Sequence, residues 1–297
     1  MIQKIISWIK NYYNLDVVKI RKITNKTLKV ELSNNTIFII KIINKKINKI
    51  YEYLKLSDVK NILYPKDYFV IDKTHFFIYQ YIEEIYIPLN KKVLNLKDSL
   101  FILHQSTLID KKLSSKEYKY LKRIYEKLDY KFKMLESFVR TSESKPIKED
   151  FEWIVLSKYN IFLNCKDYMY QLQKKIHTSI DNKESVKYAL NHGNPDITHI
   201  INNNFINFEN SRLCIVVSDI AKFYVENSFI NINWKDTIKE MLIPYEGDFY
   251  KNYFKFLVLY IYMINLNINN TYSYETLNAY IRISEKIKIF INTFNNF

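Results

Sequence analysis

The stretch NHGNPDITHIINNNFINFE, residues 191–209, decides how this chain is interpreted. It contains Gly193, one of only two glycines in a chain of 297 residues, directly after a histidine. Two short apolar runs, 197–201 and 205–208, flank three consecutive asparagines at 202–204. Short apolar runs on either side of turn-forming residues predict a β-hairpin. We therefore expect one small β-hairpin at this place in the chain.

The sequence before this hairpin divides into a short sheet region and a long helical one. After an N-terminal amphipathic helix with Ile2, Ile5, Ile6 and Ile9 on one face, short β-branched runs alternate with turn residues. The expected strands are 16–23, 27–33, 36–43, 67–72 and 75–82, with a helix at 45–57. These elements predict a small β-rich domain that ends near Glu84.

Beyond Pro88, apolar residues recur at three- and four-residue spacing, which is typical of helices. The expected helices are 96–110, 115–138, 148–164, 166–180, 182–190, 220–227, 234–242, 247–265 and 273–294. The predicted fold is therefore α+β and bilobal, with a β-rich N-terminal lobe at 1–84 and a helical C-terminal lobe at 85–297 that contains the hairpin.

Composition excludes two common classes of nucleotide-binding protein. A Walker A loop needs two glycines before its lysine and a dinucleotide-binding fingerprint needs three, and Gly193 and Gly247 satisfy neither pattern. The hydrophobic fraction of 48% is enough for a packed core. Cys165 and Cys214 have no metal-ligand spacing and make no disulfide framework.

The net charge of +14 is consistent with either a solvated basic surface or a site for polyanions. Almost all the cations are lysines in a chain rich in Asn, Ile and Tyr, a pattern that AT-rich coding produces, so the solvated surface is favoured. The start of the chain lacks the features of a secretory signal. The longest apolar stretch, 256–264, is far shorter than the ~20 residues that cross a bilayer. We expect a cytoplasmic protein with no transmembrane segment.

This order of elements resembles the kinase-like fold of aminoglycoside phosphotransferases and choline kinases. The third expected strand is similar to the strand of that family that carries the ATP-contacting lysine, here Lys41. The resemblance implies an acidic partner for this lysine on the next helix, where Glu52 stands. It also implies that the segment 78–84 is the hinge that reads a nucleotide base, with Gln80 and Ile82 as cofactor-binding residues.

The hairpin region carries the strongest part of the resemblance. The family pattern is His-Gly-Asp, an Asn five residues after the Asp, and then Ile-Asp-Phe or Ile-Asp-Trp. The resemblance implies a catalytic role for His192 and for Asn194, which holds the position of the catalytic base, and the two metal-binding positions hold His199 and Asn207. Phe208 follows the second metal-binding position, and Glu209 comes next. Glu209 matches the acid that follows the metal-binding Asp in choline kinases.

These substitutions imply impaired chemistry. An asparagine amide cannot accept a proton at neutral pH, and Mg²⁺ prefers anionic oxygen ligands to a histidine. Asp196 and Glu209 remain near the loop, so a rearranged active site that uses them is the alternative. The substitutions look most similar to those of the spore-coat kinase-like proteins of endospore formers.

Three hypotheses follow. The first is a catalytically impaired pseudokinase that acts as a binding or structural protein, with a nucleotide or small molecule as ligand and with protein partners if it is a scaffold of a spore coat or another assembly. The second is an active ATP- and Mg²⁺-dependent kinase of a small hydroxylated or amino-bearing molecule that uses Asp196 or Glu209. The third is a basic, polyanion-binding helical protein with Tyr and Lys interleaved at 116–133, although nucleic acid is the least favoured partner.

Overall fold

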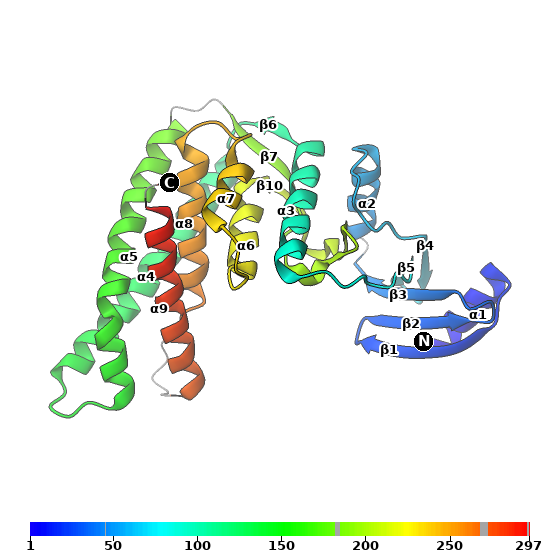
Figure 1. Cartoon of the computed structure of the whole chain (residues 1–297), viewed down its shortest axis with the longest axis horizontal. Helices are drawn as coiled ribbons and strands as arrows, with labels where there is room; N and C mark the ends of the chain where they lie inside the picture. The colour runs from blue at the N-terminus through cyan, green and yellow to red at the C-terminus, as the bar shows by residue number, and fades with distance from the viewer. Residues whose placement is uncertain (45, 182–184, 268–272, 296) are drawn as a thin grey trace. The chain divides into compact units, whose positions relative to one another are not determined.

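The computed structural model describes residues 1–44, 46–181, 185–267, 273–295 and 297 (Figure 1). The chain forms two compact units, one of residues 1–108 with 189–213 and one of residues 109–188 with 214–297. The first unit therefore includes the hairpin and the helix that follows residue 88, both of which the sequence assigns to the helical lobe. The lobe boundary at residue 84 stays a prediction.

The first unit is built on a five-stranded antiparallel sheet in the order β1-β2-β3-β5-β4. Its strands are β1 (Val17–Thr24), β2 (Thr27–Leu32), β3 (Ile37–Ile43), β4 (Asp67–Ile71) and β5 (Thr74–Gln80), and the helix α2 (Lys46–Leu56) separates β3 from β4. The predicted series of three strands, a helix and a hairpin is confirmed. Asp72 and Lys73 both have positive φ in the β4–β5 turn, which suits the right-handed twist of a tight hairpin.

The helix α1 (Ile2–Tyr13) covers one face of this sheet. Ile5 and Ile9 are completely buried against sheet residues, and the Trp8 ring stacks on Phe69 at 4.1 Å between centroids. The expected apolar face is thus narrower than predicted, because Ile2 remains half exposed. Burial on this side leaves the other face of β3 free to line a site.

The remaining parts of the first unit are the helix α3 (Leu89–Ser106) and the segment 189–213. This segment contains the 3₁₀ turn η1 (Ile197–His199), the strands β8 (Ile200–Ile201) and β9 (Asn204–Phe205), and the 3₁₀ turn η2 (Phe208–Asn210). The predicted hairpin is confirmed, although its strands are shorter than expected. Chain 61–63 pairs with β9 through two backbone hydrogen bonds of 2.8 and 2.9 Å, which fasten the hairpin to the rest of the unit.

The second unit is mainly helical. Its helices are α4 (Ser115–Ser144), α5 (Asp150–Asp181), α6 (Val217–Asn227), α7 (Trp234–Leu242), α8 (Asp248–Ile264) and α9 (Tyr274–Phe294), and β6 (Ile109–Lys111) precedes them. Buried aromatic rings of Tyr224, Phe254, Phe290 and Phe294 meet where α6, α8 and α9 pack together. Among the residues described, no helix is long and apolar enough to cross a membrane.

Two sequence predictions in this region are wrong. The helices expected at 148–164 and 166–180 form the single helix α5, because no Gly or Pro interrupts the buried stripe that Cys165 and Met169 continue. Most of the helix expected at 182–190 is instead the strand β7 (Val186–Asn191). The first three residues of that prediction, 182–184, are outside the part of the chain that the structure describes. The run VKYALN of β7 is almost wholly buried and pairs with β6, and a short buried run has no period that separates strand from helix.

Candidate functional site

Gly193 fixes the path of the chain between β7 and the hairpin. Its φ is +85°, a region that residues with a Cβ rarely adopt. A Cβ at this position would lie 2.8 Å from the carbonyl carbon of Asn210 and closer still to its oxygen. Gly193 is therefore required twice, for its backbone angle and for the close approach of the η2 backbone.

The side chain of His192 is buried against the chain that leaves the hairpin. It is completely buried, and its Nε2 is 2.8 Å from the carbonyl oxygen of Ile206, to which it donates. The ring also stacks on Phe205 at 4.6 Å and meets Phe208 edge-on at 5.0 Å. The catalytic role that the sequence suggests for His192 stays a prediction; in the structure its contacts tie the end of β7 to residues 205–208.

Asn194 and His199 bond to each other. His199 Nδ1 lies 2.7 Å from the Asn194 carbonyl oxygen and 3.3 Å from its side-chain amide nitrogen. Both contacts cannot be made by one ring nitrogen, because the first needs Nδ1 as donor and the second needs it as acceptor. The shorter contact decides, so Nδ1–H donates to the carbonyl.

Asp196 caps the 3₁₀ turn η1. Its Oδ1 accepts hydrogen bonds from the backbone N–H of Thr198 at 2.8 Å and from the Thr198 hydroxyl at 2.5 Å. These are the bonds of an N-cap, which satisfies a donor that the turn leaves without a partner. Asp196 therefore has a local structural role that accounts for a carboxylate at this position.

Lys41 is directed into the interior of the first unit by the alternation of β3. Phe38 and Ile40 are buried on the α1 side, so Ile39 and Lys41 face the opposite way. Lys41 Nζ forms an ion pair of 2.8 Å with Glu209 Oε1 and donates a hydrogen bond to Asn207 Oδ1.

The pairing of Lys41 with Glu52 that the sequence predicted is not formed. Glu52 is exposed on α2 and accepts a hydrogen bond of 2.7 Å from Asn48 one turn earlier. Its place is taken by Glu209, whose proximity to Lys41 depends on pairing between distant segments.

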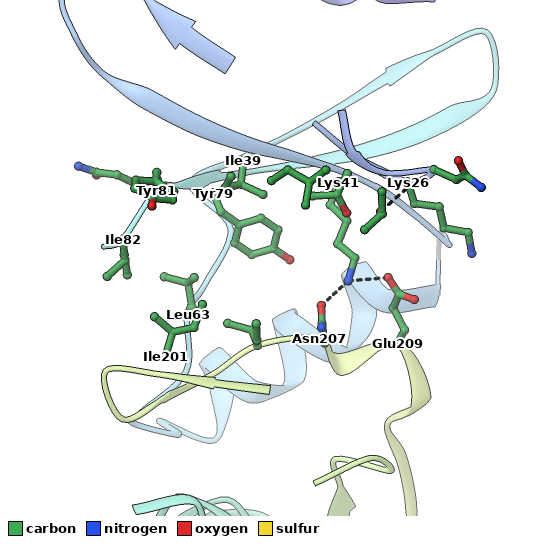
Figure 2. A pocket seen from close by; sticks show the side chains of 16 residues that line it. Lys26, Ile39, Lys41, Leu63, Tyr79, Tyr81, Ile82, Ile201, Asn207 and Glu209 are labelled. Carbon is green, nitrogen blue, oxygen red and sulfur yellow. Dashed lines mark hydrogen bonds and ion pairs between the residues drawn. The ribbon is translucent and has the colours of Figure 1, made fainter. Parts of the chain in front are cut away.

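A cavity of about 720 Å³ lies beside this ion pair (Figure 2). This volume is within the range of ~300–1,000 Å³ that is usual for small-molecule sites. Figure 2 shows Ile39 and Tyr79 of the sheet on one side and Leu63 and Ile201 on the other, with Lys41, Asn207 and Glu209 together at one end. The described lining residues are Ile23, Thr24, Asn25, Lys26, Thr27, Ile39, Lys41, Leu63, Tyr79, Gln80, Tyr81, Ile82, Ile201, Ile206, Asn207 and Glu209.

Tyr79 lines the cavity, and its phenol is neutral. Burial raises its pKa well above the ordinary value, and the nearby Tyr51 hydroxyl and the Glu209 carboxylate raise the pKa further. The two hydroxyl oxygens of Tyr51 and Tyr79 are 3.1 Å apart. Tyr79 thus presents an uncharged aromatic surface at any physiological pH.

The hinge segment is tied to the tip of the hairpin. The side chain of Asn202 accepts from the Ile85 N–H at 2.9 Å and donates to the Glu83 carbonyl oxygen at 2.8 Å. This clamp joins the two chain segments that supply Ile82 and Ile201 to the cavity. The Asn202 side chain therefore contributes to the position of Ile201 relative to Ile82.

The residues at the cavity do not fit Mg²⁺. Mg²⁺ binds anionic oxygen in octahedral geometry. Asn207 and Glu209 both bond to Lys41, and the His199 Nδ1 donates to Asn194. In the part of the chain that the structure describes, no three His, Cys, Asp or Glu side chains gather as a metal site.

The structure brings five of the sequence-predicted site residues to the cavity: Lys41, Gln80, Ile82, Asn207 and Glu209. The other five do not line it: Glu52, His192, Asn194, Asp196 and His199. Sequence reasoning missed the apolar walls. Ile39 and Tyr79 follow from strand alternation relative to Lys41 and the hinge, but Leu63 carries no local signal, because its place depends on pairing with the distant β9.

Solved kinase structures share this fold. The chain matches the aminoglycoside phosphotransferase of Alicyclobacillus acidocaldarius with a TM-score of 0.64 and 10% identity, over 94% of this chain and 92% of that one. It matches the GDP complex of aminoglycoside 2'-phosphotransferase-IIIa with a TM-score of 0.52 and 12% identity, over 100% and 99% of the two chains. The match to the amicoumacin kinase hAmiN, solved with AMP-PNP and Ca²⁺, has a TM-score of 0.52 and 12% identity, over 92% and 88%.

No protein-family model and no curated protein matches the sequence. At these identities the structural likeness establishes the fold, which is the α+β kinase-like fold predicted from the sequence.

Proposed function

We propose that this protein is a pseudokinase: a kinase-fold protein that binds a purine nucleoside or nucleotide without Mg²⁺ and does not transfer a phosphoryl group. The observation that carries the proposal is the state of Glu209. Among the described residues around the cavity it supplies the only carboxylate, and Lys41 neutralises it at 2.8 Å. Phosphoryl transfer needs a base for the acceptor and anionic oxygens for the metal.

Binding is supported by the shape and composition of the cavity. Its walls are apolar and branched, with Ile39 on one side of a slot and Leu63 and Ile201 on the other (Figure 2). The hinge residues Gln80 and Ile82 also line it. A flat heteroaromatic ring buries both faces in such a slot, and the backbone of a hinge offers donors and acceptors to its edge. A nucleoside-type ligand satisfies both requirements.

The loss of transfer is supported by the loop residues. Asn194 and Asn207 are neutral amides, and neither can act as a general base. The alternative of an active kinase that relies on Asp196 and Glu209 has less support, because Asp196 caps η1 and does not line the cavity.

Calorimetric titration of the full chain with adenosine, ADP and ATP, with Mg²⁺ and with a chelator, tests the proposal. We expect saturable binding of at least one of these ligands that does not change with Mg²⁺, and no ATP turnover. Ile201→Trp fills the slot and should abolish binding, whereas Ile289→Trp, at a 59% exposed position on α9, should leave it intact.

Two outcomes would overturn the proposal. One is the absence of binding by all three ligands. The other is Mg²⁺-dependent ATP turnover that is lost in Glu209→Ala, which would support the active-kinase alternative. A spore-coat location and protein partners stay predictions.

A further inference from the structure

The charged end of the cavity is already neutralised within the protein. The Lys41 and Glu209 side chains are 17% and 35% exposed, and they pair at 2.8 Å. Partial burial weakens solvent screening, so this pair interacts more strongly than an ion pair on the surface. A ligand phosphate can bind Lys41 only by displacing Glu209 or by accepting a carboxylate as its close neighbour.

We propose that the cavity selects for low ligand charge, and that it binds a neutral purine nucleoside in preference to the corresponding triphosphate. The proposal rests on the proposed function and names the ligand class of the same site. The Lys41–Glu209 pair acts as the selecting element, because it removes the main attraction for phosphate and adds a repulsion.

The arithmetic of the lining charges supports this preference. The described lining residues include two lysines, Lys26 and Lys41, and one carboxylate, Glu209. Lys26 is exposed at the β1–β2 turn, where water screens its charge. The net positive charge available to a triphosphate is therefore small, whereas an uncharged nucleoside meets no penalty from Glu209.

The β1–β2 turn provides a second, independent argument. Phosphate groups are usually held by loops that direct several backbone N–H groups at them. Here only Asn25 and Lys26 connect the paired residues Thr24 and Thr27, and neither is a glycine. The Lys26 N–H donates to the Thr24 hydroxyl at 3.2 Å, and the Lys26 carbonyl accepts from Ile42 at 2.8 Å. The Lys26 N–H is thus used within the turn, and this two-residue turn lacks the glycines and the length of a phosphate-binding loop.

The remaining walls suit an uncharged ligand. Tyr79 is neutral, and Ile39, Leu63 and Ile201 offer only apolar contacts (Figure 2). The free energy of binding must then come from apolar burial and hinge hydrogen bonds, both of which a nucleoside provides without phosphates.

The test compares adenosine, guanosine and ATP in chelator with the parent chain, Glu209→Gln and the matched control Glu52→Gln. Both substitutions neutralise one glutamate, but Glu52 is exposed on α2 and does not line the cavity. We expect the parent to bind a nucleoside at least about tenfold more tightly than ATP. Glu209→Gln should raise the affinity for ATP about tenfold or more and change that for the nucleoside by less than about twofold. Glu52→Gln should change neither.

Lys41→Gln provides a second variant, which should retain the nucleoside and weaken ATP further. Circular dichroism melting checks that each variant is folded. Tighter binding of ATP than of the nucleosides by the parent would overturn the selection by charge and leave the pseudokinase proposal standing. If Glu209→Gln bound ATP with the same affinity as the parent, the selection by charge would likewise be overturned and the pseudokinase proposal would stand. Absence of binding by every adenine and guanine ligand would instead overturn both proposals.

Discussion

Replacing Gly193 with alanine should destabilise the first unit specifically. The backbone angle of +85° costs a residue with a Cβ roughly 1–2 kcal/mol. The new Cβ would lie 2.8 Å from the Asn210 carbonyl carbon, and relieving such overpacking costs about 1–3 kcal/mol more. Alanine also lowers the conformational entropy of the unfolded chain, which stabilises the folded state by only about 0.4–1 kcal/mol. The two destabilising contributions are larger than this gain, and we expect the free energy of unfolding to fall by roughly 1–4 kcal/mol.

The assay combines thermal unfolding with hydrogen exchange measured by mass spectrometry. A loss of this size lowers Tm by about 2–4 °C per kcal/mol in a domain of this length. Exchange should increase most in peptides from 189–213 and from the pairing segment 61–63, which belong to the same unit. Gly247→Ala is the control for the backbone cost, because Gly247 also has a positive φ, of 94°, and lies in the helical unit. A Tm within about 1 °C of the parent with unchanged exchange at 189–213 would refute the steric reasoning.

Three further predictions follow from particular contacts. Asn202→Ala removes the two hydrogen bonds that the Asn202 side chain makes with Glu83 and Ile85, each of which contributes about 1 kcal/mol. Amide hydrogen exchange should therefore rise at 83–87, and the affinity for ligand should fall. Asn35→Ala, at another turn residue with positive φ, should change neither quantity. Burial raises the pKa of Tyr262 to about 12, so the stability that its neutral form contributes is present below the unfolded pKa of about 10 and is lost as pH rises from 10 towards 12, by about 3 kcal/mol. Chemical denaturation followed by circular dichroism at pH 9 and pH 12 should therefore show a smaller loss of stability in Tyr262→Phe than in the parent, and equal losses in the two chains would contradict this. If the charge of +14 is a solvated surface, binding to heparin should vanish near ~0.2 M salt, and retention there through a local lysine cluster on α4 would favour the polyanion hypothesis.

The fold could be predicted in large part because its signals are local. The β-branched runs and turn residues of the sheet are adjacent in sequence, and the glycine of the hairpin region stands where only a glycine fits. The prediction failed at 186–191, where a fully buried strand has no alternation to separate it from a helix.

The site could be predicted only in part, because ion pairing is not local. The resemblance predicts Lys41 from its strand but assigns it Glu52, which is near in sequence, whereas the structure pairs it with Glu209, which is 168 residues away. The pairing of 61–63 with β9 fastens the hairpin to the sheet unit, and Glu209, which follows the hairpin, then lies beside Lys41. The structural roles of His192 and Asp196 likewise depend on backbone atoms that the sequence does not place.

The effect of Mg²⁺ on nucleotide affinity, compared between the parent chain and Asn194→Asp/Asn207→Asp, tests the central claim most directly. A neutralised site predicts that the parent binds ADP or a nucleoside equally with Mg²⁺ and with chelator, and that the double variant acquires Mg²⁺-dependent nucleotide binding. A parent chain that already requires Mg²⁺ to bind nucleotide, or that turns over ATP, would contradict it.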